Sequence, residues 1–156
     1  MKLVTYGHYG RISLGAIVDD AIVDISAVAP DMLHLIEMGP TGLAAAGLII
    51  AESVDAIPLA DVYLLAPIPM PRRNVMCVGK NYAEHARESN EARGEKVELP
   101  KYPVIFTKAT TAMNGPFDDV PINPDVSSEM DFEAELGVVI GRTGRNIGRD
   151  EALDYV

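Results

Sequence analysis

The first 65 residues alternate apolar and polar positions in short runs that predict β-strands. Three such runs cover residues 2–6, 11–18 and 21–25, and turn sequences separate them: Gly7-His8-Tyr9-Gly10 after the first run and Asp19-Asp20 after the second. The chain is therefore predicted to open as a small antiparallel meander.

A helical spacing of apolar residues follows the meander. Pro30-Asp31 favours a helix start and Gly39-Pro40 a helix end, so we expect one short helix between them and a second over about Thr41 to Ser53. His34 lies inside the first helix with no ligand-type partner at a useful spacing, which favours a packed or surface histidine over a site. Another strand is expected over residues 61–65.

Three prolines between positions 67 and 71 mark a stiff connector, because proline at this density stops both helix and sheet. We place a domain boundary there. It separates a small N-terminal α/β module, residues 1–69, from a second domain, residues 70–156. A module of about 70 residues is at the lower end for independent folding.

The second domain contains apolar runs that predict strands, and the runs over 74–79 and 136–141 are expected to be buried. The longer runs cover residues 74–79, 102–108 and 136–141, and a short edge segment is expected over 120–122. One helix and several strands in this order predict an α+β fold class.

The helix of this domain carries a candidate acid–base pair. The chain turns from a loop into a helix over residues 80–88, with Asn81 as the expected N-cap. His85 and Glu88 are three apart, so their side chains meet on one helix face. A carboxylate beside an imidazole orients it and gives an acid or base that works near neutral pH. The alternative is an ordinary surface pair, which is the commoner explanation of an isolated His-x-x-Glu.

Other features of the domain also have two explanations each. The polar residues 91–101 form either a lid over this helix or a solvated connection. Lys108, at the end of a predicted strand, offers a cation to a bound carboxylate or is a charged strand terminus. Cys77 lies inside an apolar strand and is expected to be a core residue rather than a nucleophile.

Acidic residues precede the last predicted strand at alternating positions. Glu133 and Glu135 point to one face of an extended chain, and Asp131 falls on the same face. Like charges this close repel, and a hard divalent ion, Mg²⁺ before Ca²⁺ or Mn²⁺, offsets that repulsion. The alternative is a solvated acidic face on an edge strand, which the spacing alone favours.

Composition narrows the class of partners. The 156 residues are 48% hydrophobic, enough to bury a core, and the formal net charge is −10. An acidic protein is not expected to bind nucleic acid or an anionic membrane through charge. The N-terminus lacks the apolar core of a signal peptide and the single cysteine excludes an intrachain disulfide, so we expect a cytoplasmic protein.

Taken together, three stretches resemble the fumarylacetoacetate hydrolase family. They are residues 74–88 (NVMCVGKNYAEHARE), 103–108 (PVIFTK) and 130–141 (MDFEAELGVVIG), and they match in order and approximate spacing. The leading module resembles the small N-terminal domain of many bacterial members. This resemblance implies a mixed β-roll catalytic fold, incomplete in this chain, that usually forms a homodimer.

The resemblance also assigns roles. It implies Mg²⁺ or Mn²⁺ bound by two glutamates, here Glu133 and Glu135, and by a downstream aspartate. His85 and Glu88 match the family's acid–base dyad, on a helix that orders when substrate binds, and Lys108 matches an active-site lysine. The implied activity is Mg²⁺-dependent hydrolysis of a C–C bond in a 1,3-diketo acid of the fumarylacetoacetate or acylpyruvate type. The alternatives are isomerase, hydratase or decarboxylase chemistry on a 2-oxo acid.

The C-terminus departs from the family pattern. Family catalytic domains continue past a segment like residues 151–156, and the third metal ligand lies in that continuation. Asp150 is expected to cap a helix that has fewer than two turns here. We therefore expect a truncated form, a proteolytic fragment or one piece of a longer product. A catalytically inactive fragment with a structural or partner-binding role is the alternative from another functional class.

Overall fold

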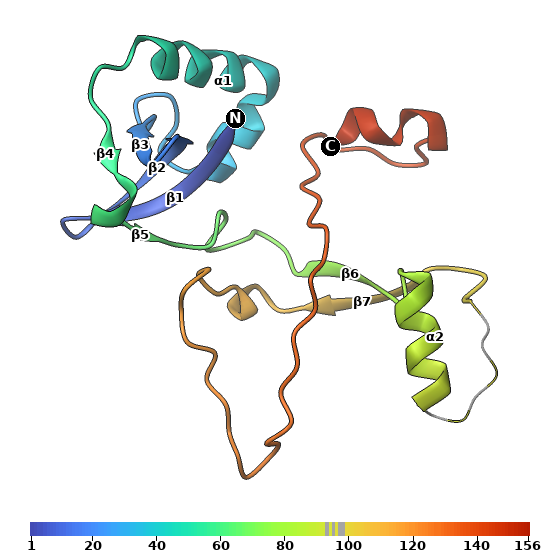
Figure 1. Ribbon diagram of the computed structural model, residues 1–156. Helices are drawn as coiled ribbons and strands as arrows, with labels where there is room; N and C mark the ends of the chain where they lie inside the picture. Colours follow the sequence, from blue (N-terminus) through green and yellow to red (C-terminus); the bar gives the residue numbers. More distant parts are fainter. Residues whose placement is uncertain (93, 95, 97–98) are drawn as a thin grey trace. The chain divides into compact units, whose positions relative to one another are not determined.

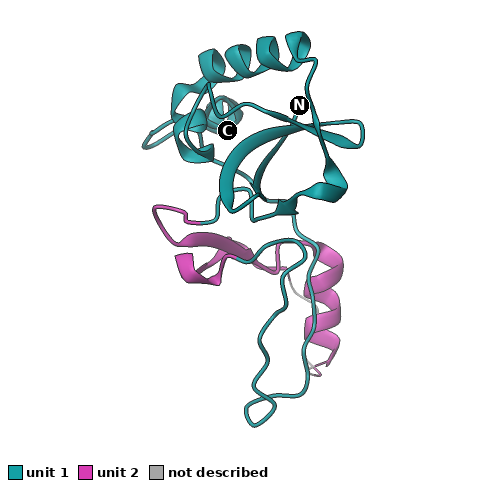
Figure 2. Cartoon of the chain, turned by 90° about the vertical axis from the view of Figure 1, so that its left-hand side faces the viewer, with its two compact units in different colours: residues 1–69, 114–156 teal, residues 70–113 magenta. Residues whose placement is uncertain are grey.

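A computed structural model describes residues 1–92, 94, 96 and 99–156 (Figure 1). Its internal contacts divide the chain into two units, Met1–Pro69 with Asn114–Val156, and Met70–Met113 (Figure 2). The first division falls at the proline-rich connector. The two-domain scheme of residues 1–69 and 70–156 remains a prediction, because residues 114–156 group with the first unit.

A five-stranded antiparallel sheet organises the first unit. Its strand order is β4-β3-β2-β1-β5, so the chain's opening meander forms the centre and two short later strands form the edges. The strands are β1 (Lys2–His8), β2 (Arg11–Val18), β3 (Ala21–Asp24), β4 (Ile57–Pro58) and β5 (Tyr63–Leu64). The predicted meander is confirmed, whereas the predicted strand over 61–65 shrinks to β5.

The meander has two turns, and the first is shorter than predicted because Gly7 and His8 belong to β1. Tyr9 and Gly10 connect β1 to β2 with φ angles of 45° and 76°, the left-handed pair that a type I′ hairpin turn requires. Asp19, with a φ of 50°, begins the connection from β2 to β3. Aspartate tolerates this conformation better than most residues, which explains the Asp19-Asp20 turn.

Helix α1 (Met32–Glu52) packs on this sheet and is divided as the sequence predicts. Asp31 is its N-cap, and the Asp31 carboxylate accepts a 3.0 Å hydrogen bond from the His34 backbone and lies 2.8 Å from His34 Nδ1. These bonds, the backbone one first, hold the pKa of Asp31 below its usual value. At Gly39 the backbone leaves helical geometry, with φ 57° and ψ −139°, just before Pro40. His34 is thus part of a helix cap.

The core of the first unit lies between α1 and the sheet. Its buried members are Leu14, Val23, Ile25, Ala29, Met32, Leu35 and Ala46. By length and composition alone α1 would pass for a membrane-spanning helix. Met32, Leu35 and Ala46 of this helix are buried in the core, whereas Met38, Leu43 and Leu48 are exposed.

Gly15 lets β2 pass close to its neighbours. A Cβ atom there would lie 2.5 Å from Ile22 Cγ2 and 2.9 Å from Tyr6 Cε1. We therefore expect Gly15→Ala to lower the free energy of unfolding by about 1–3 kcal/mol through overpacking, measured by urea denaturation. The control is Gly47→Ala in α1, where the nearest atom would be Met1 Cε at 3.7 Å. A Gly15→Ala variant as stable as Gly47→Ala would contradict the packing described here.

A buried tyrosine and an aspartate join β1 to β3. Tyr6 is 1% exposed, and its hydroxyl donates a 2.7 Å hydrogen bond to Asp24 Oδ2. Burial, and then the Asp24 carboxylate, raise the pKa of Tyr6 from 10.0 to about 12. Burial alone would raise the pKa of Asp24, but hydrogen bonds from Ser26 and Tyr6 outweigh it and hold that pKa below its usual value.

The raised Tyr6 pKa predicts a loss of stability in alkali. The folded state keeps the Tyr6 proton more tightly than the unfolded chain, so its stabilising effect is complete below pH 10 and is lost as the pH rises towards about 12. Thermal unfolding should therefore show wild type more stable than Tyr6→Phe at about pH 9, with the difference shrinking across this window. A difference that stays constant up to pH 12 would show that Tyr6 ionises normally.

The second unit consists of a two-stranded antiparallel sheet and one helix. β6 (Val75–Gly79) pairs with β7 (Val104–Lys108), and α2 (Ala83–Ala92) lies between them in sequence. The expectation that residues 74–79 form a buried strand is wrong for this chain: Met76 is 66% exposed and Val78 39%. Among the described residues these two strands pair only with each other, and a two-stranded sheet has no interior strand to bury.

Residues 114–156 differ most from expectation. The predicted strand over 136–141 and the edge segment over 120–122 are both wrong, because all these residues are described and none is in a strand. At the end of the first segment the Gly141 amide donates to the Tyr155 carbonyl at 2.8 Å. The expected cap at Asp150 is also wrong. The last element is a 3-10 helix, Arg149–Tyr155, capped by Gly148.

Candidate functional site

Helix α2 presents the predicted acid–base pair on its exposed side. His85 and Glu88 are both exposed, whereas Ala86 and Asn90, one turn apart, are buried. The three-residue spacing places the imidazole and the carboxylate on neighbouring positions of the helix surface. The helix begins at Ala83, so the expected N-cap at Asn81 is wrong by one position or more. The structure thus places both residues on α2 with their side chains open to solvent.

The segment after α2 is only partly described. The helix continues through Glu91 and Ala92, so the predicted loop over 91–101 starts later than expected. Residues 93, 95, 97 and 98 of that loop lie outside the described residues. The prediction of a lid in this segment stays a prediction.

Lys108 lies at the far end of the two-stranded sheet from the start of α2. It pairs with Val75, the first residue of β6, whereas Gly79, the last residue of β6, leads into the loop before the helix. Four residues of strand separate these ends by about 13 Å. The structure therefore does not bring Lys108 beside the start of the helix that carries His85. Its proposed contact with a substrate carboxylate stays a prediction.

The predicted metal ligands lie in the other unit. Glu133 and Glu135 are exposed and sit in the extended segment before Gly141, where Asp131 Oδ1 accepts a 2.8 Å bond from the Phe132 amide. Carboxylate oxygens are the donors that hard divalent cations prefer, so this pair fits Mg²⁺ or Mn²⁺ chemically. Within the described ranges, no group of three or more His, Cys, Asp or Glu side chains is close enough to hold a metal ion. Further ligands are needed to complete the coordination.

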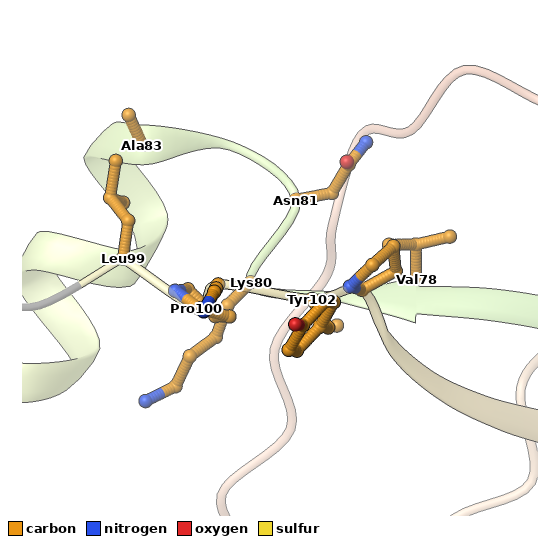
Figure 3. Close-up of a pocket in the computed structure, with 10 residues that line it drawn as sticks. Val78, Lys80, Asn81, Ala83, Leu99, Pro100 and Tyr102 are labelled. Carbon is orange, nitrogen blue, oxygen red and sulfur yellow. The ribbon is translucent and has the colours of Figure 1, made fainter. Parts of the chain in front are cut away.

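A shallow cavity beside the start of α2 was not foreseen from the sequence. Its volume is about 250 Å³, and ten residues from the end of β6, the loop to α2 and the segment before β7 line it (Figure 3). Its polar contributors include Lys80, Asn81 and Tyr102, and in the close-up the Lys80 and Asn81 side chains point in opposite directions. Lys80 has a left-handed φ of 53°, unusual for a lysine, which the sequence does not signal.

Known proteins resemble this chain over most or all of its length. Residues 74–156 match the family described as fumarylacetoacetate (FAA) hydrolase, C-terminal. "Oxaloacetate tautomerase YisK" of Bacillus subtilis (strain 168) is 31% identical over 175 residues, covering 100% of this chain and 57% of that protein. "Oxaloacetate tautomerase Fahd2a, mitochondrial" of Rattus norvegicus is 35% identical, covering 94% of this chain and 45% of its own length.

Solved structures agree with the sequence matches. The fumarylacetoacetate hydrolase of psychrophilic Exiguobacterium antarcticum superposes with a TM-score of 0.69 at 33% identity, over 99% of this chain and 52% of that one. Maleylpyruvate hydrolase from Sphingobium sp. SYK-6, in complex with manganese(II) and pyruvate, gives a TM-score of 0.75 at 25% identity, over 99% and 55%. These matches confirm the predicted α+β fold of the fumarylacetoacetate hydrolase type.

The match is to part of each relative. The chain spans about half the length of the curated relatives and of the solved structures that it matches. Within that part, the sequence profile extends from the start of β6 to Val156 and so includes α2 and the acidic segment. The chain belongs to the fumarylacetoacetate hydrolase family.

Proposed function

We propose that the full-length protein is a divalent-metal-dependent enzyme that interconverts the keto and enol forms of a 2-oxo acid such as oxaloacetate. The observation that carries this proposal is the pair His85 and Glu88 on the exposed face of α2. The reaction moves one proton between carbon and oxygen, which is the work of one positioned acid–base group. The tautomerase names of the relatives from B. subtilis and R. norvegicus support the same choice.

In this mechanism each side chain has a limited task. His85, oriented by Glu88, takes the proton from the carbon beside the keto group and then returns it to the keto oxygen, so one C–H bond breaks and one O–H bond forms. Lys108 holds a carboxylate of the substrate. Glu133 and Glu135, together with further ligands, would hold a divalent ion, Mg²⁺ or Mn²⁺ before Ca²⁺, which would supply positive charge to a developing oxyanion.

Hydrolysis of a C–C bond in a 1,3-diketo acid is the second candidate. The structural relatives named fumarylacetoacetate hydrolase and maleylpyruvate hydrolase favour it. In this case His85 takes its proton from water, and the water oxygen attacks the carbonyl carbon. The C–C bond then breaks to give a carboxylic acid and an enolate, and the enolate takes the proton back from His85. The two candidates therefore use the same dyad and differ in the proton that His85 removes.

One substrate comparison separates the candidates. The full-length protein is given the enol form of oxaloacetate, an acylpyruvate and maleylpyruvate, each with Mg²⁺ and with EDTA, and the ultraviolet absorbance of the enol or diketo group is followed. We expect metal-dependent loss of the oxaloacetate enol that exceeds any cleavage of the other two acids. Cleavage of an acylpyruvate with no effect on the oxaloacetate enol would favour the hydrolase. No metal-dependent turnover of any of them would favour an inactive role.

The proposal includes a homodimer in the cytoplasm, which the family resemblance and the sequence composition support. Light scattering of the full-length protein is expected to give twice the mass of one chain. A mass equal to one chain would contradict the dimer without affecting the proposed reaction.

A further inference from the structure

Lys80 connects the loop before α2 to the last turn of that helix. It follows directly on Gly79, the end of β6, and adopts a left-handed φ of 53°. Such a conformation is unfavourable for a lysine, so the surroundings must hold it. Lys80 Nζ donates a 2.7 Å hydrogen bond to Asn90 Oδ1. A charged donor and a buried acceptor make this one of the stronger kinds of hydrogen bond.

Asn90 is the buried polar residue of α2. It is 4% exposed, and its Nδ2 atom also donates to the Lys96 carbonyl at 3.4 Å. The apolar anchoring of the helix is small, since the other buried residue is Ala86, whose side chain is one methyl group. The bond to Lys80 is therefore one of the contacts that hold the buried face of α2.

The anchored face and the face of the acid–base pair point in different directions. With 3.6 residues per turn, Glu88 lies about 180° around the helix from the centre of the Ala86–Asn90 face, and His85 about 120° from it. Rotation of the helix about its axis therefore moves the side chains of His85 and Glu88. The contacts of the anchored face, Ala86 and Asn90, fix the angle of that rotation. An error of about 1 Å in the placement of a catalytic group can cost 100-fold in rate.

We propose that Lys80 and Asn90 are positioning residues whose hydrogen bond fixes α2 and thereby places His85 and Glu88 for proton transfer. The inference rests on the proposed function, because it assigns a task to residues that support the dyad. It extends the site from one exposed helix face to the buried face behind it and to the cavity that Lys80 lines.

The test compares Lys80→Met, Asn90→Leu and the double variant in the full-length protein, with the oxaloacetate enol and Mg²⁺. Each single variant is expected to lower kcat about 10- to 100-fold with little change in KM. The double variant should be no worse than the poorer single one, because both remove the same bond. Asn90→Asp keeps an acceptor for Lys80 and should recover most of kcat.

Two further measurements separate positioning from loss of fold. Loss of folded enzyme lowers the pH profile of kcat/KM without moving it, whereas a misplaced dyad is expected to shift its midpoint by about half a unit or more. Amide hydrogen exchange of α2 should be about 10-fold faster in Lys80→Met than in wild type. The control is Arg87→Met, which removes an exposed 2.9 Å ion pair with Glu84 on the same helix and should change neither.

The possible outcomes distinguish a failure of the positioning role from a failure of the proposed function. Unchanged exchange and unchanged kcat in both single variants would overturn the positioning role. If the two single substitutions lower kcat independently, so that their losses multiply in the double variant, the positioning role is also overturned. A change of KM in Lys80→Met alone would overturn it too, and would make Lys80 a ligand of the substrate. A wild-type protein that turns over none of the acids, while Lys80→Met still loosens α2, would refute the proposed function and leave the anchoring role in place.

Discussion

The His85→Gln variant of the full-length protein is expected to lose about 10²- to 10⁴-fold in kcat, because glutamine cannot exchange a proton near neutral pH. His85 is exposed on α2, so this substitution is expected to leave the fold and the affinity for metal unchanged. The measurement is steady-state turnover of the oxaloacetate enol with saturating Mg²⁺. A smaller loss of kcat should follow Glu88→Gln, since Glu88 orients the imidazole but does not hold the moving proton.

The chain offers a matched control in its other helix. His34 lies beside the Asp31 carboxylate at 2.8 Å, at the same three-residue spacing, but at the start of α1. His34→Gln should keep kcat within about 2-fold of wild type, since it alters a helix cap and no proposed reacting group. Equal losses in His34→Gln and His85→Gln would show that the assay reports stability rather than acid–base chemistry.

Glu133→Gln and Glu135→Gln are each expected to weaken Mn²⁺ binding about 100-fold or more. Affinity for a hard cation depends on the number of charged oxygen ligands, and each substitution removes one charge while keeping the size of the side chain. Isothermal titration of the full-length protein with Mn²⁺ measures the effect. Turnover should be restored in part by raising the metal concentration, which a loss of fold would not allow.

A charge-matched control separates coordination from general electrostatics. Asp125 is exposed, and its backbone amide donates to Asn123 Oδ1 in a turn before the acidic segment. Asp125→Asn removes one negative charge as Glu133→Gln does, but should leave Mn²⁺ affinity within about 2-fold of wild type. Three variants with the same small effect would identify the acidic stretch as a solvated face, which is the alternative that its spacing allows.

The part of the fold that could be predicted is specified by local chemistry. Asp31 caps α1 through its own carboxylate, and Gly39 with Pro40 interrupts the helix because one adopts a positive φ and the other lacks an amide hydrogen. Tyr9 and Gly10 make a two-residue turn for the same kind of reason. Such signals involve only a few neighbouring residues, so these caps, breaks and turns can be predicted from the sequence alone.

The part that could not be predicted depends on distant partners. Residues 136–141 have the composition of a strand, but a strand forms only where another pairs with it, and none does so among the described residues. Leu136 is 81% exposed. The Lys80–Asn90 bond is likewise invisible in sequence, because it requires a left-handed lysine ten residues from its acceptor.

The sequence predicts which residue types the candidate site contains, but not how the residues from different elements come together. The spacing of His85 and Glu88 placed both on one helix surface, and the structure agrees. Nothing local to Lys108 or to Glu133 fixes their distance from that surface, since each lies on another element. The roles of Lys108, Glu133 and Glu135 therefore rest on the family resemblance and on the chemistry of their side chains.

The central claim is that the dyad on α2 and the acidic pair serve one metal-dependent proton transfer on a 2-oxo acid. The most direct measurement is the rate at which the full-length protein converts the enol of oxaloacetate to the keto form, in EDTA and after Mg²⁺ or Mn²⁺ is added back. We expect activity that EDTA abolishes and that the metal restores, and that His85→Gln and Glu133→Gln each lower about 100-fold or more at the metal concentration that restores wild type. Turnover that persists in EDTA, or that survives both substitutions, would contradict the account.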